Sequence, residues 1–164
     1  MFFIAATTYF SLQEADCLPA EGRRPLLAGS DALNLMRRSA VFGVLLSVVF
    51  VVLVAFPFGD LVGHPHWSRV DWIPFVTRRV RVLDVVANLV LCAPIGVASA
   101  LAFRRGILIS AAIALPSSLA VEWAQVYSHV RFPSMTDVAC NVAGAVVAAA
   151  VVQRLRDVPP QRGT

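Results

Sequence analysis

The sequence has 164 residues, of which 58% are hydrophobic and 15% are charged, and its mean hydropathy is +0.73. Soluble domains contain roughly 45–50% apolar and about 25% charged residues, so a soluble domain of this size could not hide so much apolar surface. The net charge is +4, and all 14 basic residues are arginines that gather in short clusters between apolar runs. Such clusters are typical of topology signals and lipid headgroup contacts, and they argue against nucleic acid as a partner.

Four apolar runs are long enough to cross a bilayer, whose hydrocarbon core of ~30 Å needs about 20 helical residues. They lie at residues 39–58, 84–103, 106–127 and 136–153. The second and third runs are joined only by Arg104-Arg105, which predicts an antiparallel hairpin. The sequence therefore predicts an all-α fold, a four-helix transmembrane bundle with short loops, over residues 39–153.

The two ends of the sequence differ from this central part. Residues 1–38 mix polar and apolar side chains without a sustained period, so we expect a disordered N-terminal tail, and residues 154–164 form a short polar C-terminal tail. Met36, followed by two arginines and then the first apolar run, resembles a natural start. Whether residues 1–35 belong to the native protein is left open by the sequence.

The distribution of arginines between the loops predicts the orientation in the membrane. One side holds nine arginines, in the two tails and the Arg104-Arg105 turn, and the other side holds five. If the chain starts at Met36, the counts become seven and five. Positively charged loops stay in the cytoplasm. We therefore expect a multi-pass membrane protein with both termini cytoplasmic.

Polar residues inside the apolar runs fall at one end of the expected bundle. The second run begins there, the third ends there and the fourth begins there, so their polar side chains should share one level on the outer side. Each run contributes a pair spaced three or four residues apart, and the loop between the last two runs adds an arginine. The candidate ligand-binding cluster comprises Asp84, Asn88, Glu122, Gln125, Arg131, Asp137 and Asn141.

Each member also has a purely structural interpretation. Asp84 and Asp137 lie near helix N-termini, where the helix dipole favours an acid, and Ser134 to Asp137 is a possible capping box. The amide side chains could simply form interhelical hydrogen bonds. Glu122 is harder to explain, because a helix C-terminus favours cations and a charge at mid-bilayer costs roughly 2.5–3.5 kcal/mol on insertion scales. Glu122 should lie shallower than mid-bilayer and cost less, but it should still need a partner. We expect that partner to be Arg131, and without one Glu122 should stay neutral.

Two smaller features lie in the loops. His64 and His66 flank a proline near Asp60, and an H-x-H pair could contribute to a zinc site, but no full set of ligands is evident. We therefore expect a simple polar loop, with no metal and no cofactor. An interfacial aromatic belt is indicated by Trp67, Trp72, Trp123 and Tyr127.

The order of short motifs resembles the VanZ-like family of bacterial membrane proteins. About two-thirds of the chain carries the resemblance, roughly residues 42–152. The motifs, in chain order, are Trp72-Ile73-Pro74-Phe75, Asp84-x-x-x-Asn88, Ala93-Pro94-Ile95-Gly96, Glu122-x-x-Gln125, Arg131 and Asp137-x-x-x-Asn141-x-x-Gly144. Cys92-Ala93 replaces bulkier residues of the family, and one acid usual before the fourth helix is absent, since Ser134 and Met135 precede Thr136.

The resemblance implies a protein of the bacterial inner (cytoplasmic) membrane with a role at the cell envelope, since the named member of the family is associated with teicoplanin resistance. On this basis the favoured hypothesis is a non-catalytic module that binds a lipid headgroup or a lipid-linked cell-wall precursor and so affects glycopeptide susceptibility. One alternative is a membrane-embedded enzyme acting on a lipid-linked phosphate, although the sequence has no His-rich metal set, no G-x-S-x-G motif and no Walker element. Others are a proton relay or transport element, and an assembly partner within an oligomer or a larger membrane complex.

Overall fold

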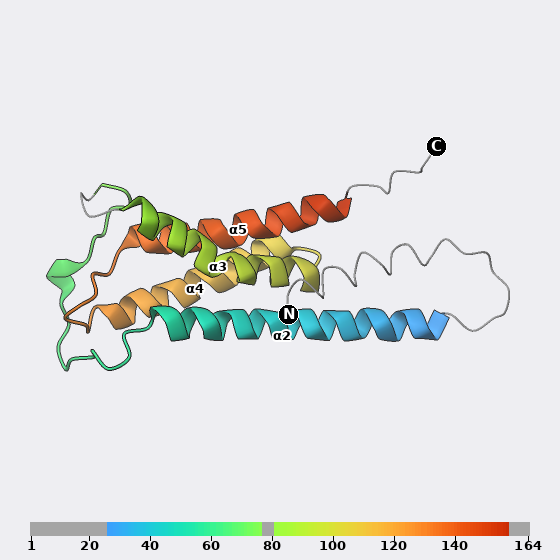
Figure 1. Cartoon of the computed structure of the whole chain (residues 1–164), viewed down its shortest axis with the longest axis horizontal. Helices are drawn as coiled ribbons and strands as arrows, with labels where there is room; N and C mark the ends of the chain where they lie inside the picture. The colour runs from blue at the N-terminus through green and yellow to red at the C-terminus, as the bar shows by residue number, and fades with distance from the viewer. Residues whose placement is uncertain (1–25, 77–80, 158–164) are drawn as a thin grey trace. The chain divides into compact units, whose positions relative to one another are not determined.

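The computed structural model describes residues 26–76 and 81–157, and these ranges contain four long helices and no strand (Figure 1). The helices are α2 (Leu26–Ala55), α3 (Val82–Ala102), α4 (Gly106–Gln125) and α5 (Met135–Asp157), with a short 3₁₀ turn, η2 (Trp67–Arg69), between α2 and α3. All of α3, α4 and α5, and α2 from Asn34 onward, are long and apolar enough to cross a membrane. The expected all-α bundle of four transmembrane helices is confirmed.

The ends of the helices differ from the predicted bounds. Helix α2 begins at Leu26, within the expected tail, and α5 continues to Asp157. Between Leu26 and Arg38 only Gly29 strongly disfavours a helix, so a helix started by the apolar run can extend backwards without a break. The rest of the expected N-terminal tail, Cys17, the loop arginines Arg78 and Arg79, and the C-terminal tail from residue 158 lie outside the described residues.

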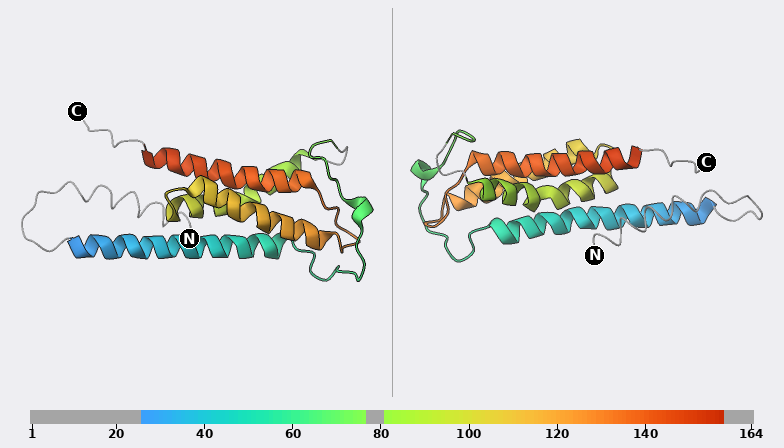
Figure 2. Two further views of the ribbon diagram at one scale, coloured as in Figure 1. Left: turned by 180° about the vertical axis from the view of Figure 1, so that it is seen from behind. Right: turned by 45° about the horizontal axis from the view of Figure 1, so that its top comes forward.

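Helices α3, α4 and α5 pack closely within the unit that spans residues 34–164. The turn at Arg104-Arg105 reverses the chain between α3 and α4, as the sequence predicts, and α5 runs beside both helices (Figure 2). At this end the side-chain amide of Gln153 donates a hydrogen bond to the carbonyl of Arg104 at 3.1 Å, and Arg156 donates to the carbonyl of Ala100 at 2.5 Å. These bonds join the end of α5 to α3 and to the Arg104-Arg105 turn.

Two glycines allow α3 and α5 to touch backbone to backbone. A Cβ placed on Gly96 of α3 would lie 2.0 Å from the carbonyl oxygen of Ala145 in α5. A Cβ placed on Gly144 of α5 would lie 2.0 Å from the carbonyl oxygen of Leu89 in α3. Small residues let helices approach closely in membranes, where packing replaces the hydrophobic effect as the driving force.

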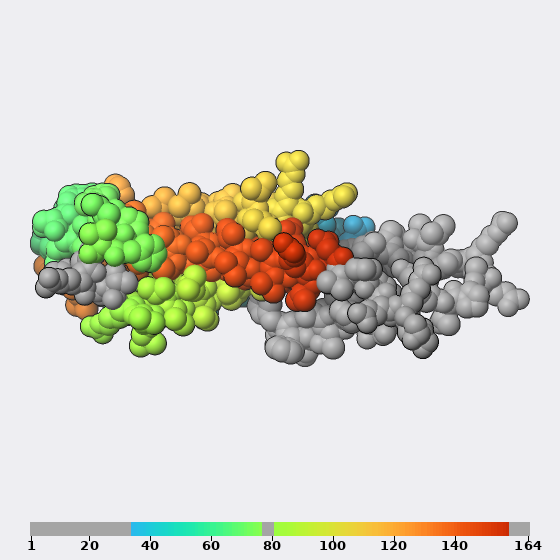
Figure 3. Space-filling view, turned by 90° about the horizontal axis from the view of Figure 1, so that it is seen from above, coloured from blue at the N-terminus to red at the C-terminus, as the bar shows by residue number. Residues whose placement is uncertain are grey.

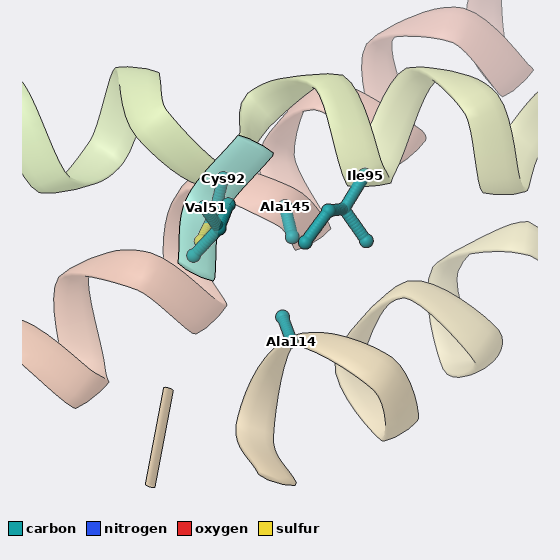
Figure 4. Packing of buried hydrophobic residues seen from close by; sticks show 5 residues of the cluster. All are labelled: Val51, Cys92, Ile95, Ala114 and Ala145. Carbon is teal, nitrogen blue, oxygen red and sulfur yellow. The ribbon is translucent and has the colours of Figure 1, made fainter. Parts of the chain in front are cut away.

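The buried core between the helices is built from small and medium side chains (Figure 4). Each helix contributes at least one residue, so the core joins all four; its members are Val51, Cys92, Ile95, Ala114 and Ala145. On α2 the buried positions Val44, Ser47 and Val51 follow a helical spacing, and the other faces of that helix carry exposed apolar side chains. That pattern suits a helix with one face on the bundle and the others in lipid.

The long α2–α3 loop is tied to the α4–α5 loop by backbone hydrogen bonds. Val62 donates to the carbonyl of Tyr127 at 2.7 Å, and further along Asp71 donates to the carbonyl of Pro133 at 2.9 Å. Met135, at the start of α5, donates to the carbonyl of Asp71 at 3.0 Å. Figure 3 shows the α2–α3 loop in green at the end of the unit where α5 begins. This loop end of the bundle is therefore an ordered layer of paired segments.

Candidate functional site

The loop end of the bundle collects the polar residues that the sequence places there. Helices α3 and α5 begin at this end and α4 finishes there (Figures 1 and 2). The charge of Asp137 acts electrostatically on Glu122, and the charge of Asp84 acts on Asp137, so the three acids from three helices are near neighbours. Asn88, one turn further along α3, is half-buried, and no hydrogen bond joins it to the other members in the described part of the chain.

Glu122 caps the helix that follows it in the chain. Its side chain is 4% exposed, and its Oε2 accepts a hydrogen bond from the backbone N–H of Ser134 at 2.7 Å. The hydroxyl of Ser134 accepts in turn from the backbone N–H of Thr136 at 3.1 Å. A capping box has two such hydrogen bonds, but here the acid that accepts one of them is Glu122 of α4 and not Asp137. The side chain of Glu122, near the end of α4, thus accepts a hydrogen bond from the residue that precedes α5.

Arg131 does not form the expected pair with Glu122. Within residues 26–76 and 81–157 no ion pair or hydrogen bond joins the two side chains, although the charge of Arg131 acts on both Glu122 and Asp137. The Arg131 side chain is exposed, and its backbone N–H donates to the hydroxyl of Ser128 at 3.0 Å. Its guanidinium is therefore available to a ligand beside a group of acids.

The two buried amides make interhelical contacts. Gln125 donates from Nε2 to the carbonyl of Ala55 at 3.1 Å, which satisfies a carbonyl at the end of α2. Asn141 donates from Nδ2 to the hydroxyl of Ser118 in α4 at 2.8 Å. The Oδ1 atom of Asn141 is buried and has no hydrogen-bond partner in the described structure. A buried acceptor without a partner costs about 1–3 kcal/mol, so Oδ1 of Asn141 is a position where a donor would be stabilising.

The candidate residues therefore divide into two groups. Glu122, Gln125 and Asn141 are buried and have internal hydrogen-bond partners, whereas Asp84 and Arg131 are exposed and Asp137 is half-buried. Only the second group can touch a ligand without rearrangement. It offers two carboxylates and one guanidinium, which suits a ligand that carries both a cationic or hydroxyl group and an anionic oxygen.

Residues outside the predicted cluster also shape this end. Asp71 acts electrostatically on Asp137 and ties the α2–α3 loop to the start of α5, which no spacing in the sequence indicates. Asp60 accepts hydrogen bonds from the hydroxyl of Ser128 and, at 3.1 Å, from the backbone N–H of Val130. The bond from Ser128, followed by that from Val130, holds the pKa of the Asp60 carboxyl below its usual value. An anionic Asp60 therefore organises the α4–α5 loop that carries Arg131.

All three tryptophans of the chain lie together at the loop end. The rings of Trp67 and Trp72 are stacked with centroids 6.4 Å apart, and Trp123 meets Trp67 edge to face at 5.4 Å. Each of the three is more than two-fifths exposed. Exposed indoles at the end of a transmembrane bundle are typical of the membrane–water interface. This arrangement suits the predicted aromatic belt.

Comparisons with known proteins identify a family but no individual relative. A family model described as VanZ/LLP1 matches residues 40–156, which span all of α3 and α4 and most of α2 and α5. No curated protein matches the chain, and no solved structure matches it. The matched range contains every member of the polar cluster.

Proposed function

The chain belongs to the VanZ/LLP1 family of membrane proteins, and from that membership we propose that its loop end binds a phosphate-bearing lipid headgroup. The headgroup of a lipid-linked cell-wall precursor is the ligand of greatest interest. Through this binding the protein would act at the cell envelope and lower susceptibility to glycopeptides of the teicoplanin type. The proposal makes the protein a binding module of the inner membrane and requires no turnover.

The observation that carries the proposal is the exposed guanidinium of Arg131, whose charge acts on Asp137, the acid on which Asp84 also acts. Within the described ranges none of these three side chains is joined by an ion pair to another, although the charges of Asp84 and Arg131 both act on Asp137. An arginine that is free of such a pair at a membrane interface suits a phosphate, to which its planar fork can donate two hydrogen bonds. The two carboxylates suit an amine or sugar hydroxyl on the same headgroup.

The position of the site also supports a lipid ligand. Exposed tryptophans favour the membrane–water interface, and the polar residues lie at the same end of the helices. A headgroup attached to an acyl or polyprenyl chain reaches this level with its tail in the bilayer, alongside the exposed apolar faces of the helices. A water-soluble ligand would lack the apolar contacts that such a tail makes.

The proposal is tested by native mass spectrometry of the full chain released from detergent micelles. Three probes separate the contributions: undecaprenyl phosphate and phosphatidylglycerol carry phosphate without an amine, and phosphatidylethanolamine carries both. We expect Arg131→Gln to weaken all three lipids. Asp84→Asn and Asp137→Asn should weaken phosphatidylethanolamine selectively. Arg105→Gln, an exposed arginine at the opposite end of the helices, is the matched control and should bind as wild type does.

Two outcomes would overturn the proposal. If Arg131→Gln and Arg105→Gln reduce lipid binding equally, the arginines act only through general charge and no headgroup site exists at the loop end. If the wild-type chain leaves the micelle without retained lipid under conditions that preserve its fold, the polar cluster is structural throughout.

A further inference from the structure

The sequence contains three histidines, and all three lie close together at the loop end of the bundle. His64 and His66 lie in the α2–α3 loop, and His129 lies in the α4–α5 loop. The ring centroids of His64 and His66 are 4.7 Å apart, those of His66 and His129 are 4.7 Å apart, and those of His64 and His129 are 5.6 Å apart. One nitrogen from each ring can be chosen so that the three atoms lie within 4.8 Å of one another.

The backbone holds these rings in register. Leu61 and Ser128 form an antiparallel bridge, and the N–H of His66 donates to the carbonyl of Val126 at 2.8 Å. Asp60 fixes the residues on either side of His129 through its hydrogen bonds with Ser128 and Val130. Backbone pairing therefore joins the two loops, and this pairing holds the three histidines close to one another.

A second contact favours one tautomer of His66. Its Nδ1 lies 3.3 Å from the carbonyl oxygen of Val126, which can only accept a hydrogen bond, so this contact favours the tautomer with the proton on Nδ1. Nε2 of His66 then has the lone pair that a metal ion requires. Metal-binding histidines in proteins commonly donate their other ring N–H to a carbonyl in this way, which fixes both ring orientation and tautomer.

We propose that His64, His66 and His129 form a binding site for one zinc-class divalent ion. Imidazole nitrogens suit Zn²⁺ and its neighbours, and a Zn–N distance of about 2.0–2.1 Å in a tetrahedral site places the ligand nitrogens roughly 3.4 Å apart. His64 and His129 are exposed and His66 is partly buried, so rotation of the two exposed rings can close the remaining distance. Three protein ligands leave one position for water or for an anionic oxygen.

The charges around the cluster are compatible with a cation. Asp60 is close enough to His129 for their charges to interact, and its carboxylate would offset part of the charge of the ion. Arg69 is a nearby positive charge, which would oppose the binding of a cation. Its Nη1 donates to the carbonyl of His129 at 2.7 Å, and its guanidinium lies 4.6 Å from the centre of the Phe132 ring. The guanidinium of Arg69 is therefore already in contact with a backbone carbonyl and an aromatic ring.

The test is metal binding by the full chain in detergent, purified without a polyhistidine tag and stripped with a chelator. Every sample carries Cys17→Ser, which removes the one thiol outside the described residues. Cobalt(II) absorption reports the ligand set, and competition between Zn²⁺ and a chromophoric chelator reports affinity. We expect one ion per chain, bound in the micromolar range or tighter. His129→Ala should weaken binding at least about tenfold, since even the loss of an outer-shell partner costs that much.

The remaining arms separate a built site from weak adsorption of metal at scattered surface groups. His64→Ala and His66→Ala should weaken binding as His129→Ala does, and Asp84→Asn, an exposed carboxyl of the polar cluster, should not. Zn²⁺ should raise the melting temperature of wild type and leave that of His129→Ala unchanged, because only a specific site stabilises the folded state. The proposal is overturned if His129→Ala binds Zn²⁺ as tightly as wild type, if Asp84→Asn removes the ion, or if wild type binds only at millimolar Zn²⁺.

Discussion

Replacement of Gly144 by alanine should separate α3 from α5 and destabilise the bundle. The added Cβ would lie 2.0 Å from the carbonyl oxygen and 2.7 Å from the carbonyl carbon of Leu89. Ordinary contacts begin near 3.4 Å, so the helices must part by more than about 1 Å. Because backbone atoms cannot rotate away, we take the upper end of the usual cost of overpacking, about 3 kcal/mol. Alanine returns about 1 kcal/mol in helix propensity, which leaves a net loss of about 2 kcal/mol.

The assay is thermal unfolding of the purified chain in detergent, followed by far-UV circular dichroism, which reports secondary structure. A loss of about 2 kcal/mol corresponds to a fall in melting temperature of about 4–8 °C for a chain of this size. Gly63→Ala is the matched control, because no atom lies within 4 Å of a Cβ there. Gly96→Ala should resemble Gly144→Ala, and the double variant should lose less than the sum, since both act on one interface. An unchanged melting temperature for Gly144→Ala would refute the close-packing argument.

Three further predictions concern single polar contacts. Glu122→Gln keeps an oxygen that can accept from the N–H of Ser134, whereas Glu122→Ala removes it. Hydrogen exchange at the start of α5 should therefore rise only in the alanine variant. Equal exchange in both variants would contradict the proposed cap. Ser118→Ala leaves the buried Asn141 amide without its partner and should cost about 1–3 kcal/mol in the same melting assay, a loss that Ser117→Ala should not match. Asp60 has a lowered pKa in the fold, so its hold on the α4–α5 loop is complete above the unfolded value and is lost as pH falls through the folded value. Loop exchange in wild type, corrected for its intrinsic pH dependence, should therefore rise in acid, and Asp60→Asn should abolish that rise.

The helices could be predicted from the sequence because lipid imposes a simple rule. A span of about 20 apolar residues is readable without knowledge of its neighbours, and the two-residue turn at Arg104-Arg105 forces the α3–α4 hairpin. The same topology brings Asp84, Glu122 and Asp137 to one end, which follows from the direction of each helix. The start of α2 at Leu26 could not be predicted, because helix propensity beyond the apolar run gives no periodic signal.

The partners of the polar residues could not be predicted, because they depend on contacts between segments far apart in the sequence. A buried acid such as Glu122 is expected to need a cation, yet it finds a backbone N–H at the start of the next helix, which requires knowing how the α4–α5 loop folds back. In the same way, α3 and α4 separate His129 from His66 in the sequence, so the H-x-H motif at His64 and His66 does not indicate that His129 lies beside it. The capping motif at Ser134 is the one local clue, and it supplies half of the observed arrangement.

The measurement that tests the central claim most directly is the teicoplanin concentration that stops growth of a glycopeptide-sensitive bacterium expressing the chain. Wild type, Arg131→Gln and the control Arg105→Gln should be compared at equal protein levels in the membrane. If the loop end binds an envelope ligand, wild type and Arg105→Gln should raise that concentration, and Arg131→Gln should not. If all three raise it equally, Arg131 has no part in the function, and if none raises it, the proposed effect on glycopeptide susceptibility is wrong.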